Sequence, residues 1–414
     1  MKFRYILYVL LLSLMNATLA FGAPFVQLDE AQIERVKTSL ENQTASEPTL
    51  AAYNALIKQA DHLLDSGHFS VTDKTILAPT KDPHDYLSIS RYWWPDAAKD
   101  NGLPWIRKDG QTNPDTQTDK VDRKRIGEMA QAVENLGHAY YFSGNEAYAE
   151  KGTALIKAWF LDPETQMNPN LNYAQTVPGI AKQRRSGILD GRLIPLKVLD
   201  SITLFSRSDH WSGTDDEEMN VWLRRYLKWL TKSKLGKEGA KQTNNHGSWY
   251  RFQTTALAFY LGEEKILNSQ LKLTRKAMTR QFNREGAQEH ELTRTKSFFY
   301  SCFNLDAVTR IALIADRAGQ SLWDYPTTET SKLSQAVNFL MPTAQGEAWP
   351  YPTQGVNLNH FIPVLDRFAD QTGAAEHKAL LKKLLDASGG HAPKEIAETH
   401  IYDRFALFKP EALD

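Results

Sequence analysis

Apolar residues recur at the spacing of an α-helix along most of this 414-residue chain, and no other feature constrains the fold as strongly. One helical face is predicted by Leu50, Tyr53, Leu56, Ile57, Ala60, Leu63 and Leu64, and a second by Ile126, Met129, Ala130, Val133, Leu136 and Tyr140. A capping box of Thr214 and Glu217 predicts the start of a third helix. Strand-like alternation is scarce, so the chain is predicted to be all-α.

Glycines followed by polar residues mark the ends of several predicted helices, at Gly144, Gly262, Gly319 and Gly373. Their spacing fits a helical hairpin of about 55 to 60 residues that repeats along the chain, with one further turn hidden near residues 206–208. Repeated hairpins build a ring or a solenoid. Such an array forms one unit despite its length, so residues 21–414 are predicted to be a single domain.

The first twenty residues have the composition of a secretory signal peptide. Lys2 and Arg4 precede an apolar run from Ile6 to Leu14, and small residues lead to an expected cleavage after Ala20. An uncleaved membrane anchor is the alternative, but the run is shorter than the roughly 20 residues that span a bilayer. The mature protein is therefore expected to be periplasmic or secreted, with no membrane contact after cleavage.

The charge balance and the cysteine count exclude further classes of protein. The 49 Lys and Arg residues equal the 49 Asp and Glu residues, whereas a general nucleic-acid binder is basic, so no nucleic-acid partner is expected. The single cysteine, Cys302, cannot form an intramolecular disulfide. Stability must therefore come from the core.

Three segments interrupt the helical pattern and are rich in aromatic, basic and amide side chains, which makes them the predicted functional site. The first covers residues 86–119, the second residues 168–192, and the third residues 241–250 together with residues 289–300. We expect the first of these segments to close over a bound ligand and exclude water.

The candidate residues in these segments also have structural interpretations. Trp93 and Trp94 could belong to the core, although their charged neighbours suit a platform for a pyranose ring. His246 could be a structural histidine, but the amides of Asn244 and Asn245 before it favour a polar site. Tyr300 alone would be assigned to the core.

A basic cluster follows the Pro178-Gly179 turn and consists of Lys182, Arg184, Arg185 and Arg192. Such clusters are commonly solvated surfaces. At the entrance to an apolar helix they could instead bind carboxylates, because an arginine binds a carboxylate through two parallel hydrogen bonds. We expect these side chains and Arg294 to converge on one cleft.

Several other chemistries lack their sequence motifs. The chain contains no His-Glu-x-x-His zinc motif, Walker loop, dinucleotide-binding glycine fingerprint or Gly-x-Ser-x-Gly elbow. Glu289, His290 and Glu291 could bind a metal, but adjacent residues on a helix point apart. An inverting glycosidase needs two carboxyl groups ~6.5–9.5 Å apart. Its candidates are Asp190, Glu238, Glu289 and Glu291.

Over about residues 80 to 320 the chain resembles the bacterial alginate lyase superfamily. Asn244, Asn245 and His246 are followed by Trp249, and Arg294 and Tyr300 come later in the chain. Further matching motifs are Tyr-x-Ser with Tyr-Trp-Trp-Pro, Asn-Tyr-Ala-Gln, and the segment with Gly187, Ile188, Asp190 and Arg192. The likeness is greatest to polysaccharide lyase family 38, whose members act on polymannuronate or glucuronan. It implies an (α/α) toroid, an incomplete barrel of six to seven helical hairpins.

The resemblance also implies the roles of the catalytic residues. Tyr300 would remove the C5 proton of a uronate and protonate the O4 leaving group. Asn245, His246 and Arg294 would offset the uronate carboxylate, with cationic Arg294 and His246 in place of a metal ion. In β-D-mannuronate and β-D-glucuronate one group would reach both H5 and O4, whereas α-L-guluronate would require a second base, most plausibly His246.

The remaining candidates are assigned to substrate binding: Tyr86, Arg91, Tyr92, Trp93, Trp94, Gln175, Gln183, Arg184, Arg185, Arg192, Asn244, Trp249 and His290. No metal and no organic cofactor are expected. The partner is an anionic uronan, and the protein is expected to be a monomer or a weak dimer. Hydrolysis on the same toroid, or oligosaccharide binding without catalysis, are the alternatives.

One geometric requirement accompanies this interpretation. Arg294 precedes Tyr300 by six residues, so on an ideal helix the two side chains would lie nearly two turns apart and about 120° round the axis. They can share a site only if the backbone between them is irregular.

Overall fold

The structure is a computed structural model that describes residues 23–326, 331–389 and 401–413. The predicted signal peptide, residues 1–20, lies outside the described residues. The helices are α2 Glu30–Glu41, α3 Glu47–Leu64, α4 Asp122–Ser143, α5 Glu146–Phe160, α6 Leu199–Phe205, α7 Gly213–Lys232, α8 Lys234–Ala240, α9 Asn245–Tyr260, α10 Glu264–Gln281, α11 Glu289–Leu292, α12 Ser297–Arg317, α13 Lys332–Asn338, α14 Met341–Gln345, α15 Ile362–Thr372, α16 Ala375–Ser388 and α17 Ile401–Phe408.

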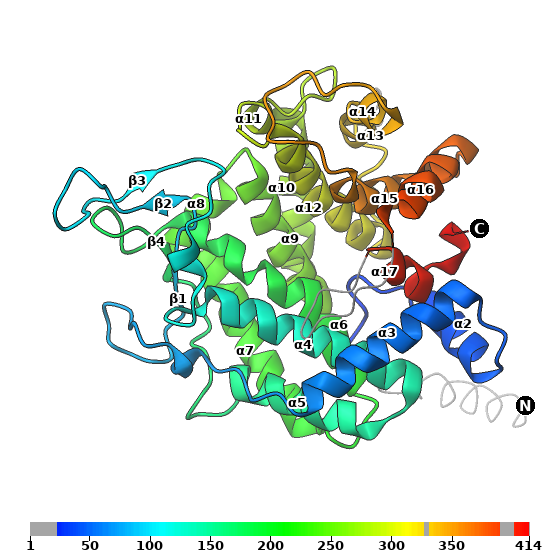
Figure 1. The fold of residues 1–414 in the computed structure, drawn as a ribbon, viewed down its shortest axis with the longest axis horizontal. Coiled ribbons are helices and arrows are strands. Elements are labelled where there is room, and N and C mark those ends of the chain that lie inside the picture. The colour runs from blue at the N-terminus through cyan, green and yellow to red at the C-terminus, as the bar shows by residue number, and fades with distance from the viewer. Residues whose placement is uncertain (1–22, 327–330, 390–400, 414) are drawn as a thin grey trace, which may run out of the picture.

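The helices form an all-α toroid, as predicted (Figure 1). Helices α4, α9 and α12 are buried on nearly all sides and form the inner layer, where each packs against its neighbours along the ring. Helices α5, α7 and α10 bury only one apolar face and cover this layer from outside. Near its two ends the chain meets itself, because α17 packs against α3. Burial on nearly all sides, which in α4 and α9 includes polar and charged side chains, thus distinguishes the inner helices from the outer ones, which are buried on one face.

The predicted hairpin turns are confirmed. Gly144, Gly262, Gly319 and Gly373 all adopt left-handed backbone conformations, with φ between 64° and 68°, and they lie at the ends of α4, α9, α12 and α15 respectively. Glycine reaches this conformation without the steric cost that a Cβ would add. The turn expected near residues 206–208 joins α6 to α7.

Two details of the sequence interpretation are wrong. The capping box of α7 is formed by Ser212 and Asp215 rather than by Thr214 and Glu217. The overlapping sequence contains both patterns, and the chain enters the helix at the earlier one because Ser212 has the extended backbone that a cap requires. The third predicted non-helical segment is also partly helical, since Asn245 begins α9 and residue 297 begins α12.

Four short strands gather on one side of the helical body (Figure 1). Strand β1 (Leu87–Ile89) pairs in parallel with β4 (Tyr173–Thr176), and β2 (Trp93–Trp94) pairs antiparallel with β3 (Ile106–Arg107). These strands lie within the first two segments that the sequence marks as non-helical. After β4 the chain continues through a 3-10 helix over Arg185–Arg192 and a π-helical turn over Ile194–Val198 into α6.

Helix α12 is long and apolar enough to cross a membrane by length and composition alone. In the toroid most of this helix is buried against α9, α15 and other inner elements. Its apolar composition is thus accounted for by packing within the protein.

A buried carboxylate fixes the first described residues beneath the ring. Asp200 of α6 accepts the backbone N–H groups of Val26, Gln27 and Leu28 at 2.6, 2.8 and 2.9 Å. On the other side, Arg317 of α12 donates to the carbonyl oxygens of Phe25 and Leu28. The segment is thereby held between two inner helices that are far away in the sequence.

Replacing Asp200 by alanine is expected to lower the free energy of unfolding by about 3 kcal/mol or more, because backbone N–H groups would be left buried without acceptors. Urea denaturation followed by circular dichroism measures the change. Asp209→Ala, an exposed acidic residue on the following turn, is the control and should stay within about 0.5 kcal/mol of the wild type. Equal stability of the two variants would contradict the role of Asp200.

Candidate active site

A cavity of about 410 Å³ lies where the strands meet the start of α9 and of α12. The three segments singled out in the sequence all contribute to its wall. The predicted site residues that line it are Arg91, Tyr92, Trp93, Gln175, Arg184, Arg185, Arg192, Asn244, Asn245, His246, Arg294 and Tyr300. The fold therefore brings together residues separated by more than half of the chain.

The buried carboxylate of Asp190 supports one wall of this cavity. Its oxygens accept hydrogen bonds from Ser88 Oγ at 2.6 Å, Arg123 at 2.6 Å, Gln175 Nε2 at 2.8 Å and Tyr86 Oη at 3.1 Å. Burial alone would raise the pKa of Asp190, but Arg123 and the other donors outweigh it and lower the pKa. Asp190 thus remains ionised and ties β1, β4 and α4 together.

Asn245 opens α9 and lies deep in the cavity. Its backbone N–H and its side-chain Nδ2 both donate to Glu291, on α11, at 2.6 and 2.7 Å. The preceding residue, Asn244, caps the helix by accepting the N–H of His246. The amide that the sequence assigns to carboxylate binding is therefore fixed by a partner 46 residues later in the chain.

His246 is electrically neutral in this environment. Burial, together with the positive charges of Arg185 and Arg294, lowers its pKa to about 3. Its Nδ1 is buried without a hydrogen-bond partner among the described residues. The surroundings of His246 therefore favour a neutral imidazole over the cationic form that the resemblance implies, and its part in offsetting a carboxylate stays a prediction.

Arg294 and Tyr300 meet because the chain between α11 and α12 is irregular. The guanidinium carbon of Arg294 lies 3.8 Å from the centroid of the Tyr300 ring. On its other side Arg294 donates two hydrogen bonds to Asp109, at 2.8 and 3.2 Å. Burial alone would raise the pKa of Asp109, but the hydrogen bonds and charges of Arg294 and Arg107 outweigh this effect and hold the pKa well below its usual range.

The Tyr300 hydroxyl is paired with a second tyrosine. It donates to Tyr92 Oη at 3.0 Å, and Arg91 donates to the same oxygen at 3.0 Å. Burial raises the pKa of Tyr300, an effect that Arg294 partly opposes. For Tyr92 burial acts in the same direction, but Arg91 and the bond from Tyr300 outweigh it and lower its pKa. The two hydroxyls therefore form a coupled pair between two arginines.

Aromatic rings support two more of the cavity's arginines. Arg184 lies over the ring of Trp93 at 5.6 Å, and Arg192 lies over Trp249 at 5.8 Å and Phe303 at 5.7 Å. Burial lowers the pKa of Arg192 to about 10, and the guanidinium thus stays charged at neutral pH. The cavity is strongly positive, and its lining includes no Asp or Glu among the described residues.

A family model described as alginate lyase matches residues 70–349 of the sequence. The chain belongs to the alginate lyase family. A search of the solved structures finds similarity to an alginate lyase from Bacteroides ovatus, with 32% identity and a TM-score of 0.83, covering 93% of this chain and 99% of that one. Comparison with curated proteins finds no match.

Two variants of alginate lyase A1-III, a protein from Sphingomonas species A1, are also similar in structure, and both are complexed with a tetrasaccharide. Their TM-scores are 0.53 and 0.54 at 13% identity, covering 87% and 86% of this chain and 91% and 93% of theirs. At this identity the likeness concerns the fold alone.

Some predicted residues of this alginate lyase family member lie outside the cavity. Trp94 follows Trp93 on a strand and so faces the opposite side, where Lys108 lies over its ring. Trp249 is buried beneath Arg192. His290 is exposed and contacts Thr243. The others outside are Tyr86, which lines a neighbouring pocket, and the exposed Gln183.

The predicted convergence of basic residues needs one correction. Lys182 is exposed and does not line the cavity, whereas Arg184, Arg185, Arg192 and Arg294 do. The loop that carries Lys182 turns back through a bridge between residues 177 and 181 and directs the side chain to solvent.

Several residues of the site are missing from the sequence interpretation. Arg107 and Asp109 lie in the segment predicted to close over the ligand, and their charges were the available signal. Arg123 lies on the first turn of α4, and the sequence of this helix gives no sign that the residue belongs to a site. Phe299 and Phe303 line the cavity from α12, where they are indistinguishable from core residues in the sequence.

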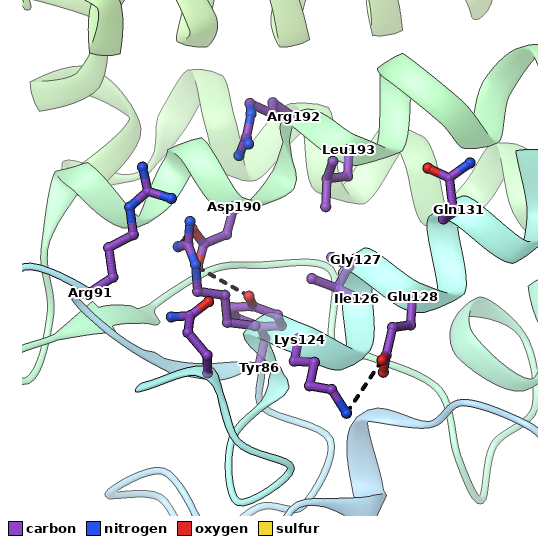
Figure 2. Close-up of a pocket in the computed structure, with 12 residues that line it drawn as sticks. Tyr86, Arg91, Lys124, Ile126, Gly127, Glu128, Gln131, Asp190, Arg192 and Leu193 are labelled. Carbon is purple, nitrogen blue, oxygen red and sulfur yellow. Dashed lines mark hydrogen bonds and ion pairs between the residues drawn. The ribbon is translucent and has the colours of Figure 1, made fainter. Parts of the chain in front are cut away.

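A second pocket, of about 340 Å³, adjoins the cavity and shares Arg91, Arg123 and Arg192 with it. Figure 2 shows the side chains of Arg91 and Arg192 extending toward the space beside Asp190. The far side is formed by α4, where Lys124 pairs with Glu128 at 3.3 Å. The two pockets therefore meet at these three arginines.

The neutral state of His246 predicts a distinctive titration. With a pKa of about 3, its imidazole resonances in ¹⁵N-labelled protein should stay unchanged between pH 8 and 5. Arg185→Ala removes a positive neighbour and is expected to raise the pKa of His246. A wild-type midpoint near the ordinary histidine value of about 6.5 would contradict the assignment.

Proposed function

We propose that this protein is an exported lyase that cleaves 1,4-linked uronate polysaccharides by β-elimination. Polymannuronate, as in alginate, is the first candidate substrate, and glucuronan is the second. The single observation that carries the proposal is that Asn245, Arg294 and Tyr300 line one cavity whose charged residues are all basic. Export rests on the predicted signal peptide.

The reaction begins at a weakly acidic carbon. The C5 proton of a uronate is α to the carboxylate, and its removal places further negative charge on that group. The Nδ2 of Asn245 and the guanidinium of Arg294 are suited to bind the carboxylate and stabilise this charge as it develops. Preorganised donors of this kind commonly contribute on the order of 10²–10³ in rate each.

Tyr300 is suited to both proton transfers. The reacting form is the phenolate of Tyr300: its oxygen takes the C5 proton, the C–H electron pair forms the C4–C5 double bond, and the C4–O4 bond breaks. The proton then passes to O4, so that the tyrosine returns to its starting state. Arg294 lies against the Tyr300 ring and stabilises negative charge on the phenolic oxygen during the transfer.

His246 fits a separate role in the proposed reaction. It is the candidate for the second base that guluronate requires, because the C5 hydrogen of guluronate is on the other face of the ring. Its lowered pKa makes it a weak base, so cleavage of guluronate is less well supported than cleavage of mannuronate.

Hydrolysis is less well supported, because none of its four candidate carboxylates is free in the cavity. Asp190 is enclosed by four donors, and Glu291 is bound to Asn245. Glu289 is exposed, and neither Glu289 nor Glu238 belongs to the cavity lining. An inverting glycosidase needs two carboxyl groups that face the scissile bond.

Replacing Tyr300 by phenylalanine should reduce turnover at least 10³-fold while substrate binding is retained, because the proton-transfer group is lost and the ring is kept. Purified protein is incubated with polymannuronate, polyguluronate and glucuronan, and ultraviolet absorbance of the unsaturated product is followed. Binding is measured by calorimetry with the inactive variant.

Tyr53→Phe, on α3 and outside the cavity, is the matched control and should behave as the wild type. New reducing ends without absorbance would instead mean hydrolysis. Binding without either signal would mean a binding protein. A Tyr300→Phe variant with nearly normal turnover would contradict the assignment of this residue.

A further inference from the structure

The contact between Glu291 and Asn245 determines how the site presents its amide. The two residues are each 1% exposed, and both Glu291 oxygens are used: Oε1 accepts the backbone N–H of Asn245 and Oε2 accepts its Nδ2. Asn245 is also the first residue of α9, where backbone N–H groups have no partner within the helix. A carboxylate at this position is stabilised by these N–H groups and by the helix dipole.

The same contact settles the orientation of the amide. An ionised carboxylate has only acceptors, so the nitrogen of the Asn245 amide, and not its oxygen, must face Glu291. One Nδ2 hydrogen is used in that bond at 2.7 Å. The second hydrogen remains available in the cavity that Asn245 lines.

We infer that Glu291 is a positioning residue, whose ionised carboxylate holds the Asn245 amide so that its remaining N–H is presented to the substrate carboxylate. The inference rests on the proposed function for its catalytic consequence, but the orientation itself follows from the contact. Glu291 does not touch the substrate in this arrangement, because it does not line the cavity.

Protonation of Glu291 would reverse the arrangement. A neutral carboxylic acid carries an O–H donor, which would attract the amide oxygen and turn the nitrogen away from its present position. The groups that act on Glu291 are the neutral Asn245 from α9 and Arg294 from its own segment. Helix α12, which also packs against α11, directs the neutral Asn304 to Gln288 beside it.

Burial raises the pKa of Glu291 to about 7, although the bonds from Asn245 and the charge of Arg294 oppose the increase. The ionised form, which orients the amide correctly, is therefore lost as the pH falls through about 7. Activity is expected to rise with pH across this range.

The decisive variant is Glu291→Gln. Glutamine can still accept the backbone N–H of Asn245 through its oxygen, but its Nε2 would oppose the Asn245 nitrogen, donor against donor. We expect kcat/KM on the uronan that the wild type cleaves to fall by about 10²-fold. The rise in activity around pH 7 should also disappear, because glutamine does not titrate. Glu291→Asp, which keeps the carboxylate, should retain that rise and recover part of the activity.

Two controls separate positioning from general stability. Glu289→Gln, two residues away on the same helix and exposed, should leave both activity and pH profile unchanged. In an Asn245→Ala background, Glu291→Gln should cause little further loss, since the residue it positions is absent. Additive losses, or a Glu291→Gln variant with normal activity and pH profile, would overturn the inference.

A measurement without turnover covers the remaining outcomes. The side-chain amide signals of Asn245, assigned by comparison with Asn245→Ala in ¹⁵N-asparagine-labelled protein, should shift as the pH crosses about 7. In the Glu291→Gln variant these signals should not shift with pH. If Glu291→Gln does not fold, Glu291→Asn replaces it in the same measurement. If the wild type cleaves no uronan, the proposed function fails while this test still decides the inference. Amide signals that do not respond to pH in the wild type would overturn it.

Discussion

Asp190 is the charged group on which the geometry of the site depends. Taking a carboxylate out of water is costly, and the cost is offset here by four donors and by the adjacent charge of Arg123. The donors come from β1 and the residue before it, from β4 and from α4, so one buried ion sets the relative positions of these elements. Two residues further along the same 3-10 helix, Arg192 is placed over its aromatic supports at the cavity. The arrangement of the binding wall thus follows from satisfying a single buried charge.

The charged residues of the cavity lining are basic, and the acidic partners of Arg294 and Arg123, which are Asp109 and Asp190, lie outside that lining. The chain as a whole is neutral, with 49 basic and 49 acidic residues. Around the cavity the balance is shifted: the arginines add to the effect of burial in lowering the pKa of His246, and Arg91 lowers the pKa of Tyr92. An anionic polymer would relieve the mutual repulsion of these cations as it binds. The negative charge of the proposed uronan substrate would therefore complement the basic lining of the cavity.

The fold could be predicted from the sequence because its signals are local. Helical periodicity and the glycines at the turns act over a few residues, and both are legible without knowledge of tertiary contacts. Asn245, Arg294 and Tyr300, which are proposed to act in catalysis, could also be predicted to share one site, because recognisable motifs carry them, and all three line the cavity. The hydrogen bonds that hold these side chains in place could not be predicted, because their partners are distant in the sequence. The bond between Asn245 and Glu291 spans 46 residues, and the bond between Arg294 and Asp109 spans 185. The pKa of His246 likewise depends on arginines that meet it only in the folded protein.

The contacts that hold residues 25–28 against Asp200 and Arg317 affect the order in which the protein folds. The partners of Val26 and Phe25 lie 174 and 292 residues further along the chain, on α6 and α12. A nascent chain emerges from the ribosome N-terminus first, so this segment is synthesised early but gains its native partners only when the inner helices of the ring have been made. The contacts of residues 25–28 with the inner helices thus form late in folding. A chain that is interrupted before α12 cannot form the contacts with Arg317.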